Sequence, residues 1–212
     1  MRLILLGAPG VGKGTQAKKL TSRYGIAHVS TGDILRAEIG SGSVLGKKAE
    51  EYVHSGQLVP DELIIDMIRE EFNSDKFKNG FLMDGFPRTL EQAEKFRTLL
   101  AELDIKIDKV INITVDENEI IKRITSRIVC SGCKKIFKMS DFEDEEDLKC
   151  DICGAELNKR KDDSEEIIKN RLEVYWKQTE PLVKFYTELD LLENIDGIGT
   201  EDEIFERILA RL

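Results

Sequence analysis

Long apolar runs are missing from this 212-residue sequence. No stretch of about 18 consecutive apolar residues occurs, so the sequence predicts no transmembrane helix. The apolar run in the opening MRLILLGAPG is too short for a signal peptide and leads directly into glycines. Hydrophobic residues still make up 41% of the chain and charged residues 34%, as in ordinary globular proteins. We therefore expect a cytoplasmic protein with one substantial core and room for a smaller inserted module.

Histidine and tryptophan are scarce too. His28 and His54 are the only histidines, and neither lies in a nucleophile arrangement. We expect both to be packed or solvated rather than catalytic. The single tryptophan, Trp176, and its neighbour Tyr175 are most simply packing residues.

An excess of basic residues is also lacking. The chain has 41 acidic and 32 basic residues, for a net charge of −9. Such a field repels a nucleic-acid backbone, and the acidic run 141–147, which we expect to be a solvated loop, adds to it. The sequence thus predicts no nucleic-acid partner and no membrane partner. A small anionic ligand stays possible where cations gather at one site.

What the sequence does contain is an alternation of strand and helix patterns. Apolar or alternating segments predict strands at 2–6, 81–84, 109–115 and 191–195. Helical periodicity covers 13–24, 31–39, 43–55, 61–72, 89–103, 117–126, 164–188 and the segment from Thr200, and capping-box spacing occurs at Thr89/Gln92 and Thr200/Glu203. This order predicts βαβ units, a doubly wound and mostly parallel sheet, and ligands at the carboxyl ends of its strands. Residues 127–163 break the pattern and indicate an excursion from the core.

A glycine loop follows the first strand and opens the first helix, from Gly7 to Thr15. Glycines let successive N–H groups point at one anion, and the helix N-terminus adds partial positive charge. Lys13 would reach the terminal phosphates of a nucleotide, and Thr15 would support the shell of a Mg²⁺ ion. The strict pattern has Ser or Thr directly after the lysine, whereas Gly14 intervenes here. The alternative is a tight strand-to-helix turn with a surface lysine, but the context favours nucleotide binding.

Asp84 to Arg88 follow the second apolar strand, so their side chains should face the same sheet edge as the glycine loop. Asp84 would hold Mg²⁺ through water, and Arg88 would bind a phosphate at two points. The alternative is a helix-capping aspartate and a solvated arginine. Farther along, Asp162 and Asp163 would either pair with Arg160 or cap the helix that begins at Ser164.

Four cysteines occur, in the pairs Cys130-x-x-Cys133 and Cys150-x-x-Cys153. In a cytoplasmic protein such pairs indicate metal ligands before disulfides. Two of them supply four thiolates with the spacing of a zinc ribbon, so the site would be closed and structural. The alternative is a redox pair.

Several motifs together resemble adenylate kinases, in order and spacing from end to end. They are the run from Gly7 to Gln16, Ser30-Thr31-Gly32-Asp33, Leu58-Val59-Pro60-Asp61, Asp84 to Arg88, and Arg171-Leu172-Glu173-Val174. The resemblance implies a P-loop kinase core with a five-stranded sheet, formed by 1–29, 60–125 and 164–212. It implies an AMP-binding flap at 30–59 and a zinc-binding lid at 126–163. The implied activity is Mg²⁺-dependent phosphoryl transfer from ATP to AMP, giving two ADP.

The same resemblance implies which residues bind the nucleotides. The ATP site would consist of Gly10, Val11, Gly12, Lys13, Gly14, Thr15, Arg123, Arg127, Ile136, Phe137 and Gly199. The AMP site would consist of Thr31, Arg36, Gln57, Leu58, Val59, Gly85, Arg88, Gln92, Arg160 and Arg171. The catalytic groups would be Lys13, Asp84, Arg88, Arg123, Arg160 and Arg171.

Two aspects are left open by the sequence. A more polar stretch of the family's lid is replaced here by Ile136, Phe137 and Lys138. The preference for ATP over other nucleoside triphosphates is therefore undecided. The same residues could form an apolar surface that binds a second copy of the chain. A monomer is the default expectation. Other acceptors (GMP, UMP or CMP) are the nearest alternative, although Thr31 and Gln92 favour AMP through the resemblance. A non-enzymatic nucleotide sensor or zinc-ribbon adaptor is the alternative from another class.

Overall fold

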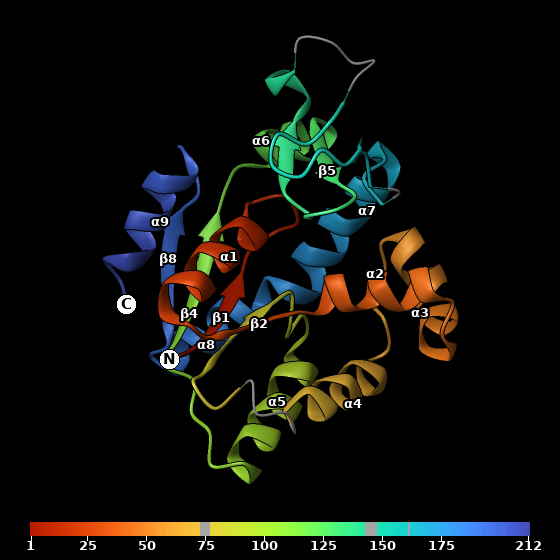
Figure 1. Cartoon of the computed structure of the whole chain (residues 1–212). Helices are drawn as coiled ribbons and strands as arrows, with labels where there is room; N and C mark the ends of the chain where they lie inside the picture. The colour runs from red at the N-terminus through yellow and green to blue at the C-terminus, as the bar shows by residue number, and fades with distance from the viewer. Residues whose placement is uncertain (73–76, 143–147, 161) are drawn as a thin grey trace.

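The computed structural model describes residues 1–72, 77–142, 148–160 and 162–212 (Figure 1). Its core is a sheet of five strands in the order β2-β3-β1-β4-β8, and every neighbouring pair is parallel. In chain order the core elements are β1 (Arg2–Leu6), α1 (Lys13–Tyr24), β2 (Ala27–Ser30), α4 (Asp61–Phe72), β3 (Phe81–Asp84), α5 (Leu90–Glu102), β4 (Lys109–Thr114), α6 (Glu117–Thr125), α7 (Glu165–Val174), a π-helical turn (Tyr175–Thr179), α8 (Pro181–Glu188), β8 (Leu192–Asp196) and α9 (Glu201–Leu209). The predicted doubly wound α/β fold is confirmed.

Helices cover both faces of this sheet, which explains why the inner strands β1 and β3 are apolar except at one end residue each. Alternate residues of β1 point to opposite faces. Ile4 and Leu6 pack in one apolar cluster with residues of α4, α5 and α8, whereas Leu3 and Leu5 pack in the other with residues of α1, α6, α7 and α9. Each cluster is buried between the sheet and one helical layer.

Strand register aligns the carboxyl ends of β1, β2 and β3. Asp84 at the end of β3 pairs in register with Leu5 of β1 and with Ser30 of β2. The glycine loop starts one residue after β1 ends. The loop, Ser30 and Asp84 therefore share the carboxyl edge of the sheet, as predicted for ligand-binding groups.

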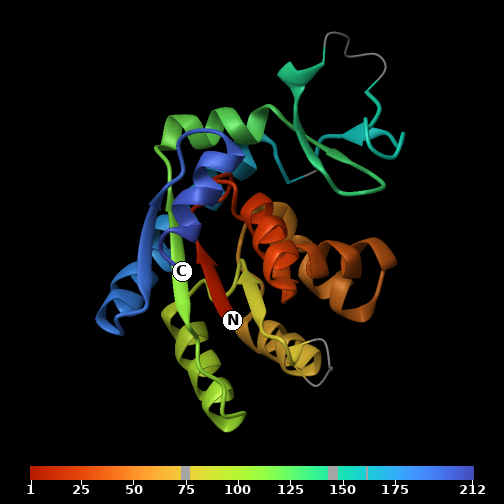
Figure 2. The same cartoon turned by 60° about the vertical axis from the view of Figure 1, so that its left-hand side comes forward.

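Two excursions project beyond this edge (Figures 1 and 2). The first is a pair of helices, α2 (Thr31–Ser41) and α3 (Val44–Ser55). The second is a three-stranded antiparallel sheet in the order β6-β5-β7, made of β5 (Arg127–Cys130), β6 (Ile136–Lys138) and β7 (Leu157–Asn158), with a 3₁₀ turn at Met139–Asp141. Both views place this small sheet above the end of α1 and apart from the five-stranded sheet.

The structure corrects several expectations. Strand β2 and the three strands within 127–163 were not predicted from periodicity. They are short, and β2 (AHVS) lacks the continuous apolar run that marks the equally short β3 (FLMD). The predicted helix 164–188 is interrupted by the π turn. At α5, Thr89 caps the helix but Gln92 does not complete a capping box, since its Oε1 accepts from Arg88 N instead. The box at Thr200 and Glu203 is confirmed. Residues 143–147 of the predicted acidic loop lie outside the described residues.

Among the described residues, no helix has the length and apolar character needed to cross a membrane.

Candidate active site

The glycine loop joins β1 to α1 through backbone conformations that only glycine adopts freely. Gly7, Gly10 and Gly12 have φ values of 134°, 86° and 101°. A Cβ added at Gly7 would lie 2.4 Å from the carbonyl oxygen of Ile113, so a larger residue does not fit there. Gly12 caps α1, whose first N–H groups have no acceptor within the helix. Such a loop is suited to bind an anion.

Lys13 folds back onto this loop. Its Nζ donates hydrogen bonds to the carbonyl oxygens of Gly7 at 2.6 Å and Ala8 at 2.9 Å. Burial, opposed by the carboxylate of Asp84 and assisted by the charge of Arg88, lowers the pKa of Lys13 to about 8. A phosphate oxygen is a stronger acceptor for an ammonium group than a carbonyl oxygen. Lys13 is therefore placed to exchange these carbonyls for an anionic ligand.

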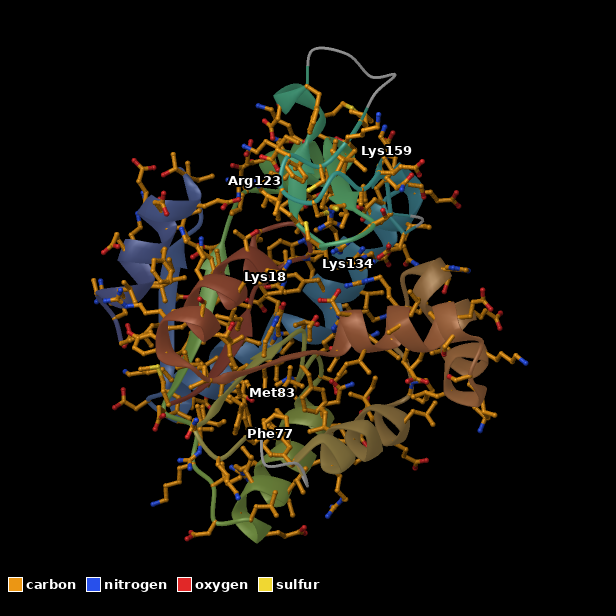
Figure 3. The ribbon with its side chains drawn as sticks, in the orientation of Figure 1. Lys18, Phe77, Met83, Arg123, Lys134 and Lys159 are labelled. Carbon is orange, nitrogen blue, oxygen red and sulfur yellow. The ribbon has the colours of Figure 1, made fainter. Side chains whose placement is uncertain are left out.

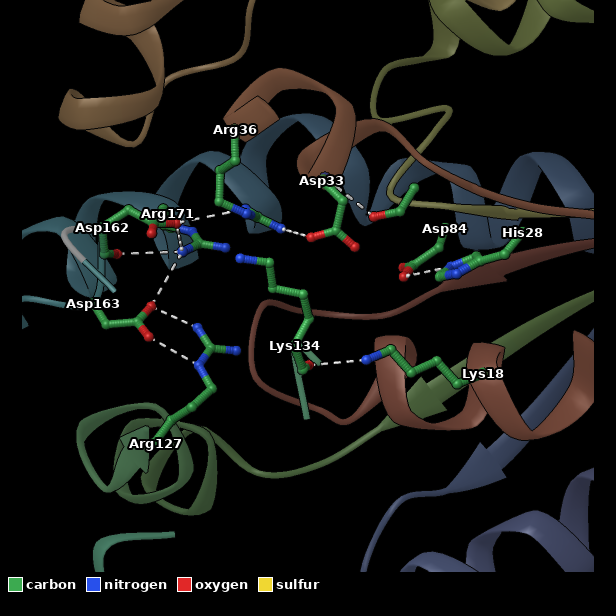
Figure 4. A network of polar contacts seen from close by, with 11 residues as sticks. Lys18, His28, Asp33, Arg36, Asp84, Arg127, Lys134, Asp162, Asp163 and Arg171 are labelled. Atoms are coloured by element: carbon green, nitrogen blue, oxygen red, sulfur yellow. Dashed lines mark hydrogen bonds and ion pairs between the residues drawn. The ribbon is translucent and has the colours of Figure 1, made fainter. Parts of the chain in front are cut away.

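Asp84 ends β3 in the same region. Its side chain is 12% exposed, and its Oδ2 lies 3.4 Å from Nε2 of His28 on β2 (Figure 4). His28 is thus partly buried beside a carboxylate. A carboxylate beside a phosphate loop can take part in the hydration shell of Mg²⁺.

Arg88 is held by three hydrogen bonds. Its Nε donates to the carbonyl oxygen of Gly85 at 2.8 Å, and its backbone N–H donates to Oε1 of Gln92 at 2.7 Å. Its carbonyl oxygen accepts from the hydroxyl of Thr179 at 2.8 Å. Burial and then the neighbouring Arg171 lower the pKa of Arg88 to about 10, so the guanidinium is charged at neutral pH. This arginine is fixed in place rather than freely solvated.

One pocket lies between the sheet edge and the helices α2 and α3. Thr31 donates from Oγ1 to the carbonyl oxygen of Gly85 at 2.9 Å in its wall. Gln92 has one end of its amide bonded to Arg88, and its Nε2 donates to Oδ1 of Asp61 at 2.5 Å. The residues predicted for AMP that line this pocket are Thr31, Arg36, Gln57, Leu58, Val59, Gly85, Arg88, Gln92 and Arg171.

A second pocket lies over the glycine loop, between it and the small sheet. Arg123 of α6, labelled in Figure 3, lies in its wall. Its Nη2 donates to the carbonyl oxygen of Gly197 at 3.0 Å, and its Nε pairs with Glu119 at 2.8 Å. The residues predicted for ATP that line this pocket are Gly10, Val11, Gly12, Lys13, Gly14, Thr15, Arg123, Arg127, Ile136, Phe137 and Gly199. Asp84 and Arg160 line it as well. The resemblance grouped Arg160 with the AMP residues, but in the structure Arg160 lines the pocket over the glycine loop.

The two pockets meet at a group of cations. Lys13, Arg36, Arg88 and Arg171 line both pockets. Arg160 is near this group, and burial, followed by Arg127 and Arg36, lowers its pKa to about 10. Cations crowded in this way favour a ligand that carries several negative charges.

Two aspartates link these arginines to one another (Figure 4). Asp163 pairs with Arg127 at 2.5 Å and with Arg171 at 3.7 Å. Asp162 pairs with Arg171 at 3.0 Å and with Arg36 at 4.0 Å. Although burial raises it, the surrounding arginines, Arg171 first, hold the pKa of Asp162 below its ordinary value.

The sequence predicted that these aspartates would pair with Arg160 or cap the helix that begins at Ser164, and the structure shows neither as their main role. Their ion pairs are with arginines other than Arg160, and Ser164 caps α7 by accepting from Ile167 N. Asp162 and Asp163 are site residues that sequence reasoning missed. The sequence signal that could have indicated their role was the position of two adjacent acidic residues between Arg160 and the start of a helix.

The cysteine cluster lies in the small sheet, away from the two pockets. The Sγ atoms of Cys130, Cys133, Cys150 and Cys153 all lie within 4.8 Å of one another, and all four thiols are free. The sulfurs of Cys130 and Cys153 are 3.3 Å apart, and those of Cys133 and Cys150 are 3.6 Å apart. A tetrahedral zinc site with Zn–S of about 2.3 Å separates its sulfurs by about 3.8 Å. The donor set fits a zinc ion that has no open coordination position.

Comparison with known proteins gives a consistent result. The family model described as "Adenylate kinase" matches residues 5–191. A curated adenylate kinase from Thermodesulfovibrio yellowstonii is 45% identical over 212 residues, which cover 100% of this chain and 99% of that protein. One from Caldicellulosiruptor saccharolyticus is 50% identical over 95% of this chain and 93% of that protein. One from Archaeoglobus fulgidus is 46% identical over 100% of this chain and 98% of that protein. With a phosphate loop, two adjoining pockets and matches that span nearly its whole length, the chain belongs to the adenylate kinase family.

Proposed function

We propose that this chain catalyses the reversible transfer of a phosphoryl group from Mg²⁺-bound ATP to AMP, giving two ADP. The observation that carries the proposal is the meeting of two pockets at shared cations. Lys13, Arg36, Arg88 and Arg171 line both. Two anionic ligands bound side by side would thus face each other across one positively charged junction, which is the arrangement that direct phosphoryl transfer needs.

The pocket over the glycine loop would take ATP. The backbone N–H groups from Gly10 to Thr15 would cradle its phosphates, and Lys13 would bind the terminal ones. Arg123 and Arg127 would bind the donor nucleotide, and Ile136, Phe137 and Gly199 would contact it on the side of the small sheet and α9. Bound Mg²⁺ would neutralise charge on the phosphates, with Asp84 and Thr15 supporting its water shell.

The other pocket would take AMP. Thr31 and Gln92 would contact the base, and Gln57, Leu58, Val59 and Gly85 would form the walls. Arg36 and Arg88 would hold the phosphate, since a guanidinium grips a phosphate at two points. Arg160 and Arg171 would lie over the group in transfer, where they would stabilise its spread negative charge.

The two excursions would act as moving parts. Residues 30–59 would form the AMP-binding flap, 126–163 the lid, and 1–29, 60–125 and 164–212 the core. Closing both would exclude water, which otherwise hydrolyses the donor. One zinc ion held by Cys130, Cys133, Cys150 and Cys153 would stabilise the lid's fold and would contact neither nucleotide. The monomeric state and the cytoplasmic location stay predictions.

The first test is turnover itself. Purified protein with ADP and Mg²⁺ should form ATP and AMP in equal amounts, and EDTA should stop the reaction. Protein that binds ATP but does not turn over would instead support a nucleotide sensor or an adaptor. Supplying AMP, GMP, UMP and CMP separately with ATP identifies the acceptor, and a preference for any acceptor other than AMP would replace this proposal with another nucleoside monophosphate kinase.

A further inference from the structure

A π-helical turn interrupts the helix that follows the small sheet, and it lies beside the pocket proposed for AMP. Tyr175–Thr179 form this turn, and the N–H of Glu180 donates to the carbonyl oxygen of Tyr175, five residues earlier, at 2.9 Å. Such turns are rare and occur often at functional sites. Val174, Tyr175 and Thr179 all line the pocket.

Pro181 gives a physical reason for the turn. Proline has no N–H, and within a continuous α-helix its ring clashes with the carbonyl group four residues earlier, here that of Lys177. One widened turn ahead of the proline relieves this clash and lets α8 begin at Pro181. Pro181 therefore requires a break in the regular helical hydrogen bonding at this place. The same break changes the direction in which one side chain of the turn points.

That side chain is Thr179, which is buried and 8% exposed. A threonine within a regular helix usually bonds to a carbonyl of the preceding turn, as Thr187 does in α8, donating to the carbonyl oxygen of Val183 at 2.7 Å. Thr179 instead donates to the carbonyl oxygen of Arg88, 91 residues away in the chain, at 2.8 Å. The π turn thus connects the C-terminal helix to the backbone of the phosphate-binding loop.

Arg88 is consequently fixed from three sides. Gln92 holds its N–H, Gly85 holds its guanidinium, and Thr179 holds its carbonyl. Of these three partners, Thr179 alone comes from a distant element. We propose that Thr179 is a positioning residue that sets the backbone of Arg88, and through it the guanidinium, for the phosphate of the acceptor nucleotide. This inference rests on the proposed function of Arg88.

The test compares Thr179→Val, which keeps the shape but loses the hydroxyl, with Thr179→Ser, which keeps the hydroxyl. Steady-state rates are measured with AMP varied at saturating ATP, and with ATP varied at saturating AMP. For Thr179→Val we expect kcat/KM for AMP to fall about tenfold, the effect of about one hydrogen bond, with KM for ATP unchanged. Thr179→Ser should recover most of the loss. Thr187→Val removes a helical threonine hydroxyl that bonds only locally, and it should behave as the wild type.

A double variant tests whether the effect passes through Arg88. In an Arg88→Ala background, Thr179→Val should change kcat/KM for AMP less than twofold, because residues that act as a unit are not additive. A full additional tenfold loss in the double variant, a KM for ATP raised as much as the KM for AMP, or no loss at all in the single variant would overturn the inference. If Thr179→Val does not fold, Thr179→Ala serves for the same comparisons. Wild-type turnover that depends on Arg88, together with a silent Thr179→Val, would refute this inference and leave the proposed function standing.

Discussion

Arg127 and Asp163 form a two-point ion pair where the small sheet joins the core. Nε and Nη2 of Arg127 donate to the two carboxylate oxygens of Asp163 at 2.8 and 2.5 Å. The side chains are 13% and 3% exposed. An arginine proposed to bind the donor nucleotide is therefore already neutralised by the protein, and this pair fixes β5 to the start of α7.

Breaking this pair should destabilise the protein. In Asp163→Asn the buried guanidinium of Arg127 loses its charged partner, and removing one member of a buried pair costs on the order of 3 kcal/mol. We expect the free energy of unfolding in urea to fall by about that amount. Asp151→Asn breaks an exposed pair with Lys135, in the loops beside the small sheet. It should change the free energy of unfolding by less than about 1 kcal/mol. Equal effects of the two substitutions would show that the Arg127–Asp163 pair contributes no more to the free energy of unfolding than an exposed ion pair does.

Nucleotide binding should be coupled to the protonation of Lys13. Burial lowers the pKa of Lys13 to about 8 in the free protein, and a bound phosphate, being negative, would raise it. Lys13 is mostly charged below pH 8, so binding there needs little proton uptake from this group. Above pH 8 ATP binding should take up close to one proton and weaken as pH rises, by at most about tenfold per pH unit.

Calorimetric titration with ATP between pH 7 and 9.5, in buffers of different ionisation enthalpy, measures this uptake. Lys13→Arg is the control, because a guanidinium stays charged over this range, and its binding should lose this pH dependence whatever its affinity. Proton uptake that is unchanged in Lys13→Arg would assign the coupling to another group.

Replacing Arg88 by lysine should remove most of the activity without unfolding the protein. Lysine keeps the charge but loses the planar two-point grip on a phosphate. Arginines that stabilise the charge in phosphoryl transfer are worth on the order of 10³-fold in rate, so we expect kcat to fall by about that factor with a near-normal melting temperature. Arg69→Lys, at an exposed pair with Glu102, should keep the wild-type rate. An Arg88→Lys enzyme of near wild-type rate would place Arg88 outside the chemistry.

Zinc should be needed for stability and not for the chemical step. Metal binding energy becomes local folding energy where a site exists only in the folded state. Among the described residues, the apolar cluster of the small sheet has only Ile128, Phe137 and Leu157 as buried members besides two of the cysteines. Cys150→Ser should therefore reduce zinc from about one ion per chain towards none and lower the melting temperature. Activity well below that temperature should fall only modestly.

Ile152→Ser is a matched control for this substitution, since Ile152 lies in the same cysteine pair and is 65% exposed. It should keep both the zinc and the melting temperature. A folded Cys150→Ser protein without any activity would connect the cysteines to catalysis. Wild-type protein that contains no zinc and forms disulfides during turnover would support the redox alternative.

Features encoded within a few residues were determined by the sequence itself. Local spacing and distinctive residue types define three such features, which are the glycine loop, the Asp84 to Arg88 motif and the two cysteine pairs. The strand–helix order also predicted that Lys13 and Asp84 would share one sheet edge, because parallel strands place their carboxyl ends together. Thr200 and Glu203 cap each other across three residues, so their capping box was predictable as well.

The tertiary structure alone decided how distant segments pair. Periodicity could not show that Asp163 binds Arg127, or that Thr179 bonds to a carbonyl 91 residues away. Nor could it reveal β2, whose four residues become a strand only by hydrogen bonding beside β3. A side chain's local sequence fixes its range of conformations, but the partner it finally meets depends on how the whole chain packs. Ion pairs and hydrogen bonds between distant elements form only once apolar burial has brought those elements together.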